Sequence, residues 1–226
     1  MDDERAAGDD AGRQVITVAD VRAACARLPA PGHVAVLELP DPRPAAILVP
    51  IVDLHGHAAV VVTKRHTALR AHGDDWVFPG GRVEADDLSS AEAARREAAE
   101  ELGIGPESIE LIGQLDTHGP ILGGYLVDVF VAVVHEVADL SPDAREVSDV
   151  AIVPLAAFLA PGNAFLAGAA STFELPATVQ AAAPFEISAQ LRWYRLREGE
   201  HLWGMQGNIL HGLLQHLTSG EHRLGD

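Results

Sequence analysis

Three glutamates close together on one predicted helix constrain this chain more than any other feature of its sequence. Residues 96–103 read REAAEELG. An α-helix turns by about 100° per residue, so Glu97, Glu100 and Glu101 share a face roughly 100° wide. Like charges at this spacing repel each other, whereas a divalent cation converts the repulsion into chelation. Carboxylate oxygens are ligands that Mg²⁺ and Mn²⁺ prefer, so the pattern predicts a metal-dependent enzyme that acts on phosphates.

Composition narrows the classes of partner and compartment. With 226 residues, the chain fits a single domain, and its 16 Lys and Arg against 33 Asp and Glu give a net charge of −17. Such acidity argues against nucleic acid as a partner but not against a small phosphorylated substrate. A single cysteine, Cys25, excludes an intramolecular disulfide and a thiolate zinc site. An acidic start and no long apolar run predict a cytoplasmic protein without a membrane segment.

The domain organisation follows from changes in composition along the chain. A Thr17–Asp20 capping box precedes a short helix that we expect to end before Pro29. We expect a disordered acidic tail at 1–14, the helix and a proline-rich lead-in at 15–44, a hydrolase domain at 45–218 with a variable insertion at 163–184, and a C-terminal tail at 219–226.

Hydrophobic patterning predicts the elements of that domain. Two β-branched runs at 45–52 and 58–63 indicate a hairpin. The glutamate helix begins at about Ser90, after a capping box, and ends at Gly103. Further strands are expected at 109–115, 125–135, 147–153, 187–197 and 201–203, with helices at 154–159 and 206–217. These elements favour an α+β fold with a mixed sheet between helices.

From Arg96 to Ile104 the chain resembles the Nudix hydrolase family. The family motif is Gly, five residues, Glu, seven residues, then Arg-Glu-apolar-x-Glu-Glu-x-Gly-apolar, and its second half matches here at every fixed position. The first half departs, since Gly81 lies fifteen residues before Arg96, one more than the motif has, and Leu88 occupies the upstream Glu position. The resemblance implies an α/β/α sandwich and hydrolysis of a nucleoside diphosphate linked to another moiety.

The longer loop is similar to that of the coenzyme A pyrophosphatase branch of this family. That loop reads roughly G-[RK]-x-D-P-x-D, and residues 81–87 here read GRVEADD. Residues 63–72 and 78–81, TKRHTALRAH and FPGG, match much of the signature of the same branch. The chain departs from it at Asp74-Asp75, which replaces Gly-Gln, at Val129, which replaces a proline, and in the length of 163–184.

The resemblance also implies roles for individual residues. Glu97, Glu100 and Glu101 are the expected ligands of Mg²⁺ or Mn²⁺, with the Gly81 carbonyl as a further ligand. The general base varies across the family, so each of these carboxylates is a candidate, and Glu146 is a candidate base or extra ligand. Arg96 is expected to orient carboxylates, and one of Glu84, Asp86 and Asp87 is a candidate for the missing upstream Glu. The expected substrate-binding residues are Lys64, Arg65, Arg70, His72 and Gly80.

Three functions remain open at this point. The first is hydrolysis of coenzyme A or its thioesters to 3′,5′-ADP and a 4′-phosphopantetheine product. The second is hydrolysis of another substrate, such as ADP-ribose, NADH or a nucleoside triphosphate, which the acidic Asp74-Asp75 pair favours. The third is a non-catalytic domain that senses a nucleotide. Many relatives form dimers, so a homodimer is expected.

Overall fold

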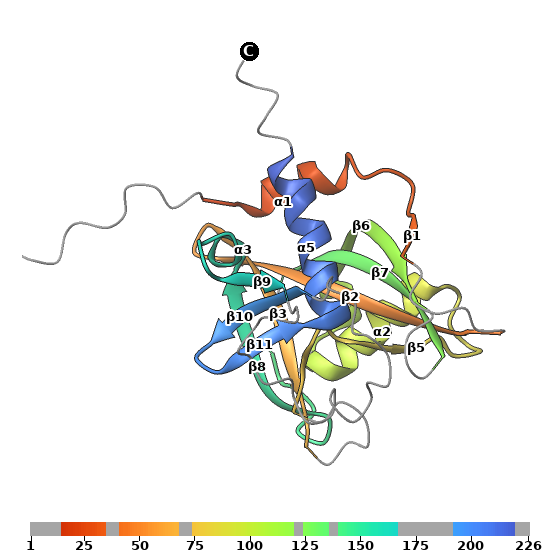
Figure 1. Ribbon diagram of the computed structural model, residues 1–226. Coiled ribbons are helices and arrows are strands. Elements are labelled where there is room, and N and C mark those ends of the chain that lie inside the picture. Colours follow the sequence, from red (N-terminus) through yellow and green to blue (C-terminus); the bar gives the residue numbers. More distant parts are fainter. Residues whose placement is uncertain are drawn as a thin grey trace, which may run out of the picture.

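A mixed β-sheet forms the centre of the molecule (Figure 1). The computed structural model describes residues 15–34, 41–67, 74–119, 124–135, 140–166 and 192–219. Strand order is β1-β6-β7-β2-β3-β4, while β5 pairs with β2 and β8 pairs with β3. The parallel pairing of β2 with β7 and the antiparallel pairing of β2 with β3 make the sheet mixed. The strands are β1 His33–Val34, β2 Arg43–Leu54, β3 His57–Arg65, β4 Trp76–Val77, β5 Gly80–Arg82, β6 Ile109–His118, β7 Tyr125–Val134 and β8 Val147–Pro154.

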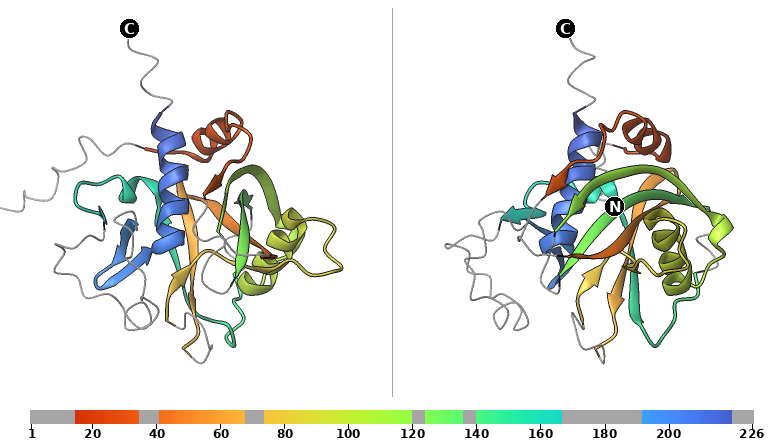
Figure 2. Two further views of the ribbon diagram at one scale, coloured as in Figure 1. Left: turned by 45° about the vertical axis from the view of Figure 1, so that its right-hand side comes forward. Right: turned by 90° about the vertical axis from the view of Figure 1, so that its right-hand side faces the viewer.

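Helices cover both faces of this sheet (Figure 2). Helix α2, Ser90–Leu102, packs on one face, while α1, Val18–Cys25, α3, Leu155–Phe158, and α5, Gly204–Thr218, pack on the other. A smaller sheet of β9, Ala164–Leu166, β10, Arg192–Arg197, and β11, Glu200–Trp203, lies beside α5, and a 3₁₀ turn, Pro106–Ser108, precedes β6. The predicted α+β sandwich with a mixed central sheet is confirmed.

The hairpin predicted from the two β-branched runs is formed by β2 and β3. Both strands are buried on both faces through their middle, which explains their continuous rather than alternating apolar sequence. The turn between them is made by His55 and Gly56, which both have positive φ, 54° and 86°. A turn with two positive φ angles matches the twist of the flanking strands and favours glycine.

The two hairpin strands separate beyond their first few pairs, and this opening positions the site. β2 pairs with β3 from Leu54↔His57 to Ile51↔Val60 and then pairs with β5 instead, through Ile47↔Gly80. β3 continues to β4, through Thr63↔Val77. Phe78 and Pro79 join β4 to β5 and fill the gap, and the Pro79 carbonyl accepts a hydrogen bond from Leu48 N at 2.9 Å. The glycines at 80 and 81 therefore lie where β2 and β3 diverge.

Other predicted elements compare as follows. The Thr17 capping box is present with both of its reciprocal hydrogen bonds, and the helix it starts ends at Cys25. Within the 163–184 segment, which the sequence predicts as a variable insertion, Ala164–Leu166 form strand β9 of the small sheet. The described residues do not include the rest of that segment or residues 187–191 of a predicted strand. They also do not include the two predicted tails, except for Ser219. Among the described helices, none has the length and hydropathy needed to cross a membrane.

Candidate active site

Helix α2 lies close to the sheet because the residues it packs there are small. Ala93, Ala94 and Ala98 are fully buried against the sheet. The Ser89 hydroxyl accepts the Glu92 backbone N–H at 3.2 Å and caps the start of the helix. Gly103 ends it with φ at 65°, and a side chain there would overlap the Ser141 carbonyl. Both ends are thus fixed, which holds the glutamate face against strand β5.

Two consecutive glycines let the β5 chain pass between β2 and α2. A Cβ at position 80 would overlap the Ala46 carbonyl, and a Cβ at position 81 would overlap the Glu97 carboxyl group. Glycine is the residue that permits such close approach. Gly81, the residue expected to offer its carbonyl to a cation, therefore lies directly against one of the expected carboxylate ligands.

Glu101 is the most deeply buried carboxylate of the helix, with 6% of its surface exposed. Burial raises its pKa to about 8, while the positive charge of Arg65 and a hydrogen bond from the Gly80 backbone act in the opposite direction. The negative charges of Glu97 and Glu146 raise the pKa further. These interactions bring together residues from α2, β3, β5 and the segment before β8, namely Glu101, Arg65, Gly80 and Glu146.

Glu97 and Glu100 complete the predicted triad in different environments. Burial raises the pKa of Glu97; Arg96 lowers it, and Glu100 and Glu146 raise it again. The Glu97 side chain is 18% exposed and that of Glu100 is 64% exposed. In the described part of the chain, no three acidic, imidazole or thiol side chains are gathered tightly enough to hold a cation as they stand. The exposed Glu100 side chain lies 3.6 Å from the Arg96 guanidinium.

The donor set nevertheless fits a hard divalent cation. Two partly or fully buried carboxylates, Glu97 and Glu101, repel each other, and the backbone of Gly81 lies against Glu97. A bound cation would relieve the cost of burying these charges and would find the oxygen ligands that Mg²⁺ and Mn²⁺ require.

Arg96 connects the helix to the loop that precedes it. Its guanidinium binds Asp87 through two hydrogen bonds of 3.0 Å, reaches Glu97 at 3.0 Å and lies 3.6 Å from Glu100. It also donates to the Arg82 carbonyl at 3.2 Å. Bidentate pairing fixes the orientation of a guanidinium, so Arg96 is held with Glu97 on one side and the β5 chain on the other.

Of the loop acids, Asp87 is the one that binds Arg96. Leu88, at the upstream Glu position, is 94% exposed. Of the three acidic candidates named from the sequence, Glu84 and Asp86 are exposed, whereas the Asp87 side chain is 7% exposed. The extra residue between Gly81 and Arg96 is the signal in the sequence, because a longer loop shifts which of its residues turns toward the helix.

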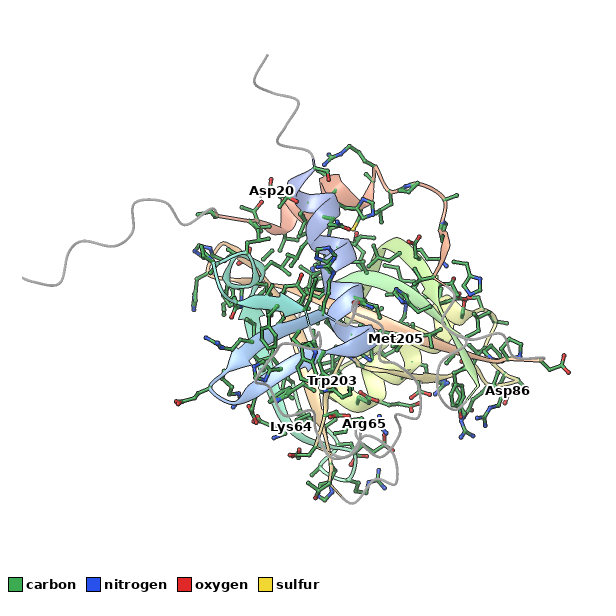
Figure 3. The ribbon with its side chains drawn as sticks, viewed as in Figure 1. Asp20, Lys64, Arg65, Asp86, Trp203 and Met205 are labelled. Carbon is green, nitrogen blue, oxygen red and sulfur yellow. The ribbon has the colours of Figure 1, made fainter. Side chains whose placement is uncertain are left out.

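The positively charged residues predicted to bind substrate differ in their partners within the protein. Lys64 pairs with Asp74 at 3.1 Å and with Glu200 at 2.8 Å. The acidic substitution at Asp74 therefore has a partner inside the protein. Arg65 faces Glu101 from the end of β3, and Figure 3 shows Lys64 and Arg65 in the lower part of the molecule, below Trp203. Arg70 and His72 lie outside the described residues.

The chain matches known proteins over most of its length. A family model described as the NUDIX domain matches residues 41–173. A protein of Pectobacterium atrosepticum described as uncharacterized Nudix hydrolase NudL is 30% identical over 76% of this chain and 81% of its own length. A NudL protein of Salmonella paratyphi B is 32% identical over the same shares. The crystal structure of RenU, a Nudix hydrolase from M. smegmatis, aligns with half of this chain and 71% of its own at 22% identity and a TM-score of 0.41.

Proposed function

The chain belongs to the Nudix hydrolase family, and from this premise we propose that it hydrolyses coenzyme A or its thioesters at the diphosphate, yielding 3′,5′-ADP and a 4′-phosphopantetheine product. As a Nudix hydrolase it is a pyrophosphatase that uses a divalent metal and acts on small nucleotide-type molecules. The identity of the substrate, the choice of Mg²⁺ or Mn²⁺ and the role of each residue are our proposals.

The observation that carries the proposal is the buried Glu101 carboxylate. A purely structural helix gains nothing from a carboxylate 6% exposed and close to Glu97 and Glu146. Strong perturbation by burial and by named charges is typical of functional sites. Support for the coenzyme A branch comes from the loop at 81–87, whose last residue, Asp87, makes the bidentate contact to Arg96.

We assign the cation ligands to Glu97, Glu100, Glu101 and the Gly81 carbonyl. A bound divalent cation neutralises phosphate charge and makes water a better nucleophile. Arg96 holds Glu97 in place, and Asp87 holds Arg96. We assign the role of general base, which accepts a proton from water, to Glu146, whose charge acts on both Glu97 and Glu101. Arg65 offers a guanidinium to a phosphate oxygen at the end of β3.

A second candidate is hydrolysis of ADP-ribose, NADH or a nucleoside triphosphate. The observation in its favour is Lys64, which was expected to bind phosphate but is neutralised by Asp74 and Glu200. Coenzyme A carries a 3′-phosphate beyond its diphosphate, so it needs more positive charge than ADP-ribose or NADH does.

A panel of substrates tests the proposal. Purified protein is assayed with Mg²⁺ and with Mn²⁺ on coenzyme A, acetyl-coenzyme A, ADP-ribose, NADH and nucleoside triphosphates, and kcat/KM is compared. We expect coenzyme A and its thioester to rank first. A kcat/KM for ADP-ribose far above that for coenzyme A would replace the first proposal with the second. Absence of turnover on the whole panel would favour a nucleotide-sensing domain.

The remaining parts of the proposal concern the protein as a whole. We propose that residues 45–218 form the hydrolase domain and that the protein works in the cytoplasm as a homodimer. Light scattering coupled to gel filtration tests the dimer, and a mass near the monomer value of 23.9 kDa would exclude it.

A further inference from the structure

The segment that leads into strand β8 packs against the end of helix α2. An α-helix leaves its last carbonyl groups without partners inside the helix, so they need donors from elsewhere. Here the Glu101 carbonyl accepts the Asp143 backbone N–H at 3.3 Å, and the Leu102 carbonyl accepts the Ser141 backbone N–H at 2.9 Å. The segment therefore completes the end of the helix that carries Glu101, a proposed cation ligand.

Asp143 is the residue through which this segment reaches Glu146, the proposed general base. The Asp143 carbonyl accepts two backbone N–H groups, from Glu146 at 3.0 Å and from Val147 at 2.8 Å. The side chain adds a third contact, because Asp143 Oδ1 accepts the Arg145 backbone N–H at 3.0 Å. An aspartate that accepts the N–H two residues further along forms an Asx turn, which fixes the backbone locally. Residues 143–147 are thus held in one tight turn.

A further backbone contact holds Glu146 from the side of strand β3. His66, directly after that strand, donates its backbone N–H to the Glu146 carbonyl at 2.7 Å. Glu146 itself is exposed, and its charge acts on both Glu97 and Glu101. Because burial does not fix this side chain, the position of its backbone decides whether the carboxylate reaches the site.

The ion pair within the turn differs from the turn itself in what it contributes. The Arg145 guanidinium donates to the Asp143 carboxylate at 2.5 and 3.0 Å, but the Arg145 side chain is 88% exposed. Exposed ion pairs contribute little, because water screens the charges and long side chains lose freedom. Hydrogen bonds from the Arg145 guanidinium and backbone lower the pKa of Asp143 to about 2, so this carboxylate is ionised at neutral pH. We therefore expect the turn to depend on Asp143 more than on its ion pair.

We propose that Asp143 is a positioning residue for hydrolysis, which holds the Glu146 carboxylate at the cation site by connecting its backbone to the end of α2. Asp143 contacts neither substrate nor the attacking water in this role, since it acts through Glu146. The proposal rests on the proposed function, because it assumes that Glu146 takes the proton from water. A general base must lie within hydrogen-bond reach of that proton, so a small displacement lowers the rate without weakening substrate binding.

Steady-state kinetics of single variants test the role of Asp143. The substrate is coenzyme A, or ADP-ribose if that ranks first in the panel, with a saturating divalent cation. We expect Asp143→Ala to lower kcat about tenfold or more and to leave KM within about twofold. Asp143→Asn keeps an oxygen that accepts the Arg145 N–H, so it should retain most of the activity. Arg145→Ala removes only the exposed ion pair and is the control that should retain full activity.

A double variant distinguishes positioning from a general loss of structure. Glu146→Gln should lower kcat about a hundredfold or more. If Asp143 acts only through Glu146, adding Asp143→Ala to Glu146→Gln causes no further loss. Multiplied losses in the double variant would overturn the proposal. Equal losses in Asp143→Ala and Arg145→Ala would also overturn it, because the ion pair and not the turn would then matter.

Amide hydrogen exchange gives a readout that needs neither metal nor turnover. In the full chain with a chelator, the N–H groups of Glu146 and Val147 should exchange about tenfold faster or more in Asp143→Ala, and at the wild-type rate in Arg145→Ala. Circular dichroism shows whether each variant is folded. Unchanged exchange in Asp143→Ala would overturn the proposal even if its kcat were low.

Failure of the proposed function gives a different result from failure of this inference. Near wild-type activity of Glu146→Gln would reject Glu146 as the general base, and with it any catalytic role for Asp143. Loss of activity in Glu146→Gln with no loss in Asp143→Ala would keep the general base and reject only the positioning residue.

Discussion

Burial shifts the pKa values of polar groups in opposite directions on the two faces of the central sheet. On the α2 face, Glu97 and Glu101 are buried among alanines, and burial raises the pKa of both. On the α5 face, large aliphatic residues form the core, and burial lowers the pKa of His118 and His211. On the α2 face, burial disfavours the charged carboxylates unless a counter-ion is bound. On the α5 face, burial disfavours the charged imidazolium, so the histidines are neutral.

This difference bears on which face can hold a cation. Buried carboxylates with raised pKa values favour a bound cation, which stabilises their charged form. The two faces thus bury different polar groups, because helices of different composition cover them.

The largest expected effect comes from removing a carboxylate on the α2 face. Glu101→Gln should lower kcat for diphosphate hydrolysis about a hundredfold or more, because a cation ligand and its charge are lost. Glu107→Gln, which changes an exposed glutamate just beyond the same helix, is the control and should keep full activity. Steady-state kinetics with Mg²⁺ and Mn²⁺ measure both. Near wild-type activity of Glu101→Gln would place the chemistry elsewhere.

The next largest effect is expected from removing Asp87, the loop residue that binds Arg96. Asp87→Ala should reduce kcat roughly 10–100-fold, since Arg96 loses its bidentate partner and Glu97 loses its orientation. Its neighbour Asp86 is exposed and is labelled at the edge of the molecule in Figure 3, so Asp86→Ala should have little effect.

A double variant tests whether an acidic residue at position 88, the usual motif position, can replace Asp87. Adding Leu88→Glu to Asp87→Ala places an acid at the usual motif position, but Leu88 is 94% exposed, and we expect no recovery. Recovery of activity would mean that the loop can shift by one residue.

A smaller effect is the pH dependence of stability without metal. The pKa of Glu101 rises from 4.5 in the unfolded chain to about 8 in the fold. Its contribution to stability is therefore fully present below pH 4.5 and is lost as the pH rises through about 8, by at most about 1.4 kcal/mol per pH unit. Denaturant unfolding in the presence of a chelator gives the free energy of unfolding of wild type and of Glu101→Gln at each pH. The difference between the two values isolates this contribution.

The same experiment with a divalent cation should reverse the trend. Cation binding requires the ionised carboxylate, so stabilisation by Mg²⁺ or Mn²⁺ should increase with pH over this range. A wild-type curve parallel to that of Glu101→Gln in both conditions would contradict the raised pKa.

The smallest expected effects come from two glycines of α5. A Cβ at Gly212 meets no atom within 4 Å, so Gly212→Ala should raise the free energy of unfolding by up to about 1 kcal/mol through helix propensity. A Cβ at Gly207 would overlap the Arg192 carbonyl, so Gly207→Ala should destabilise the protein and loosen β10 from α5. Thermal unfolding compares the two, and equal shifts of the same sign would exclude the close α5–β10 contact.

Much of the α2 face was predictable from the sequence because it depends on local spacing. The positions of Glu97, Glu100 and Glu101 on one helical face follow from the helix period, and Ser89 and Gly103 mark the ends of that helix. The hairpin turn at His55–Gly56 follows from the same kind of local rule. Such patterns involve residues within one or two turns of each other, and tertiary packing did not override them.

The rest depended on contacts between residues far apart in the chain. That Asp87, and not Glu84 or Asp86, turns toward Arg96 depends on how the loop passes over α2. The separation of β2 from β3 and the approach of Glu146 to Glu101 depend on strand register and helix packing. The sequence alone determined which carboxylates share a face. The tertiary structure decided how deeply each is buried, and burial is what sets their pKa values.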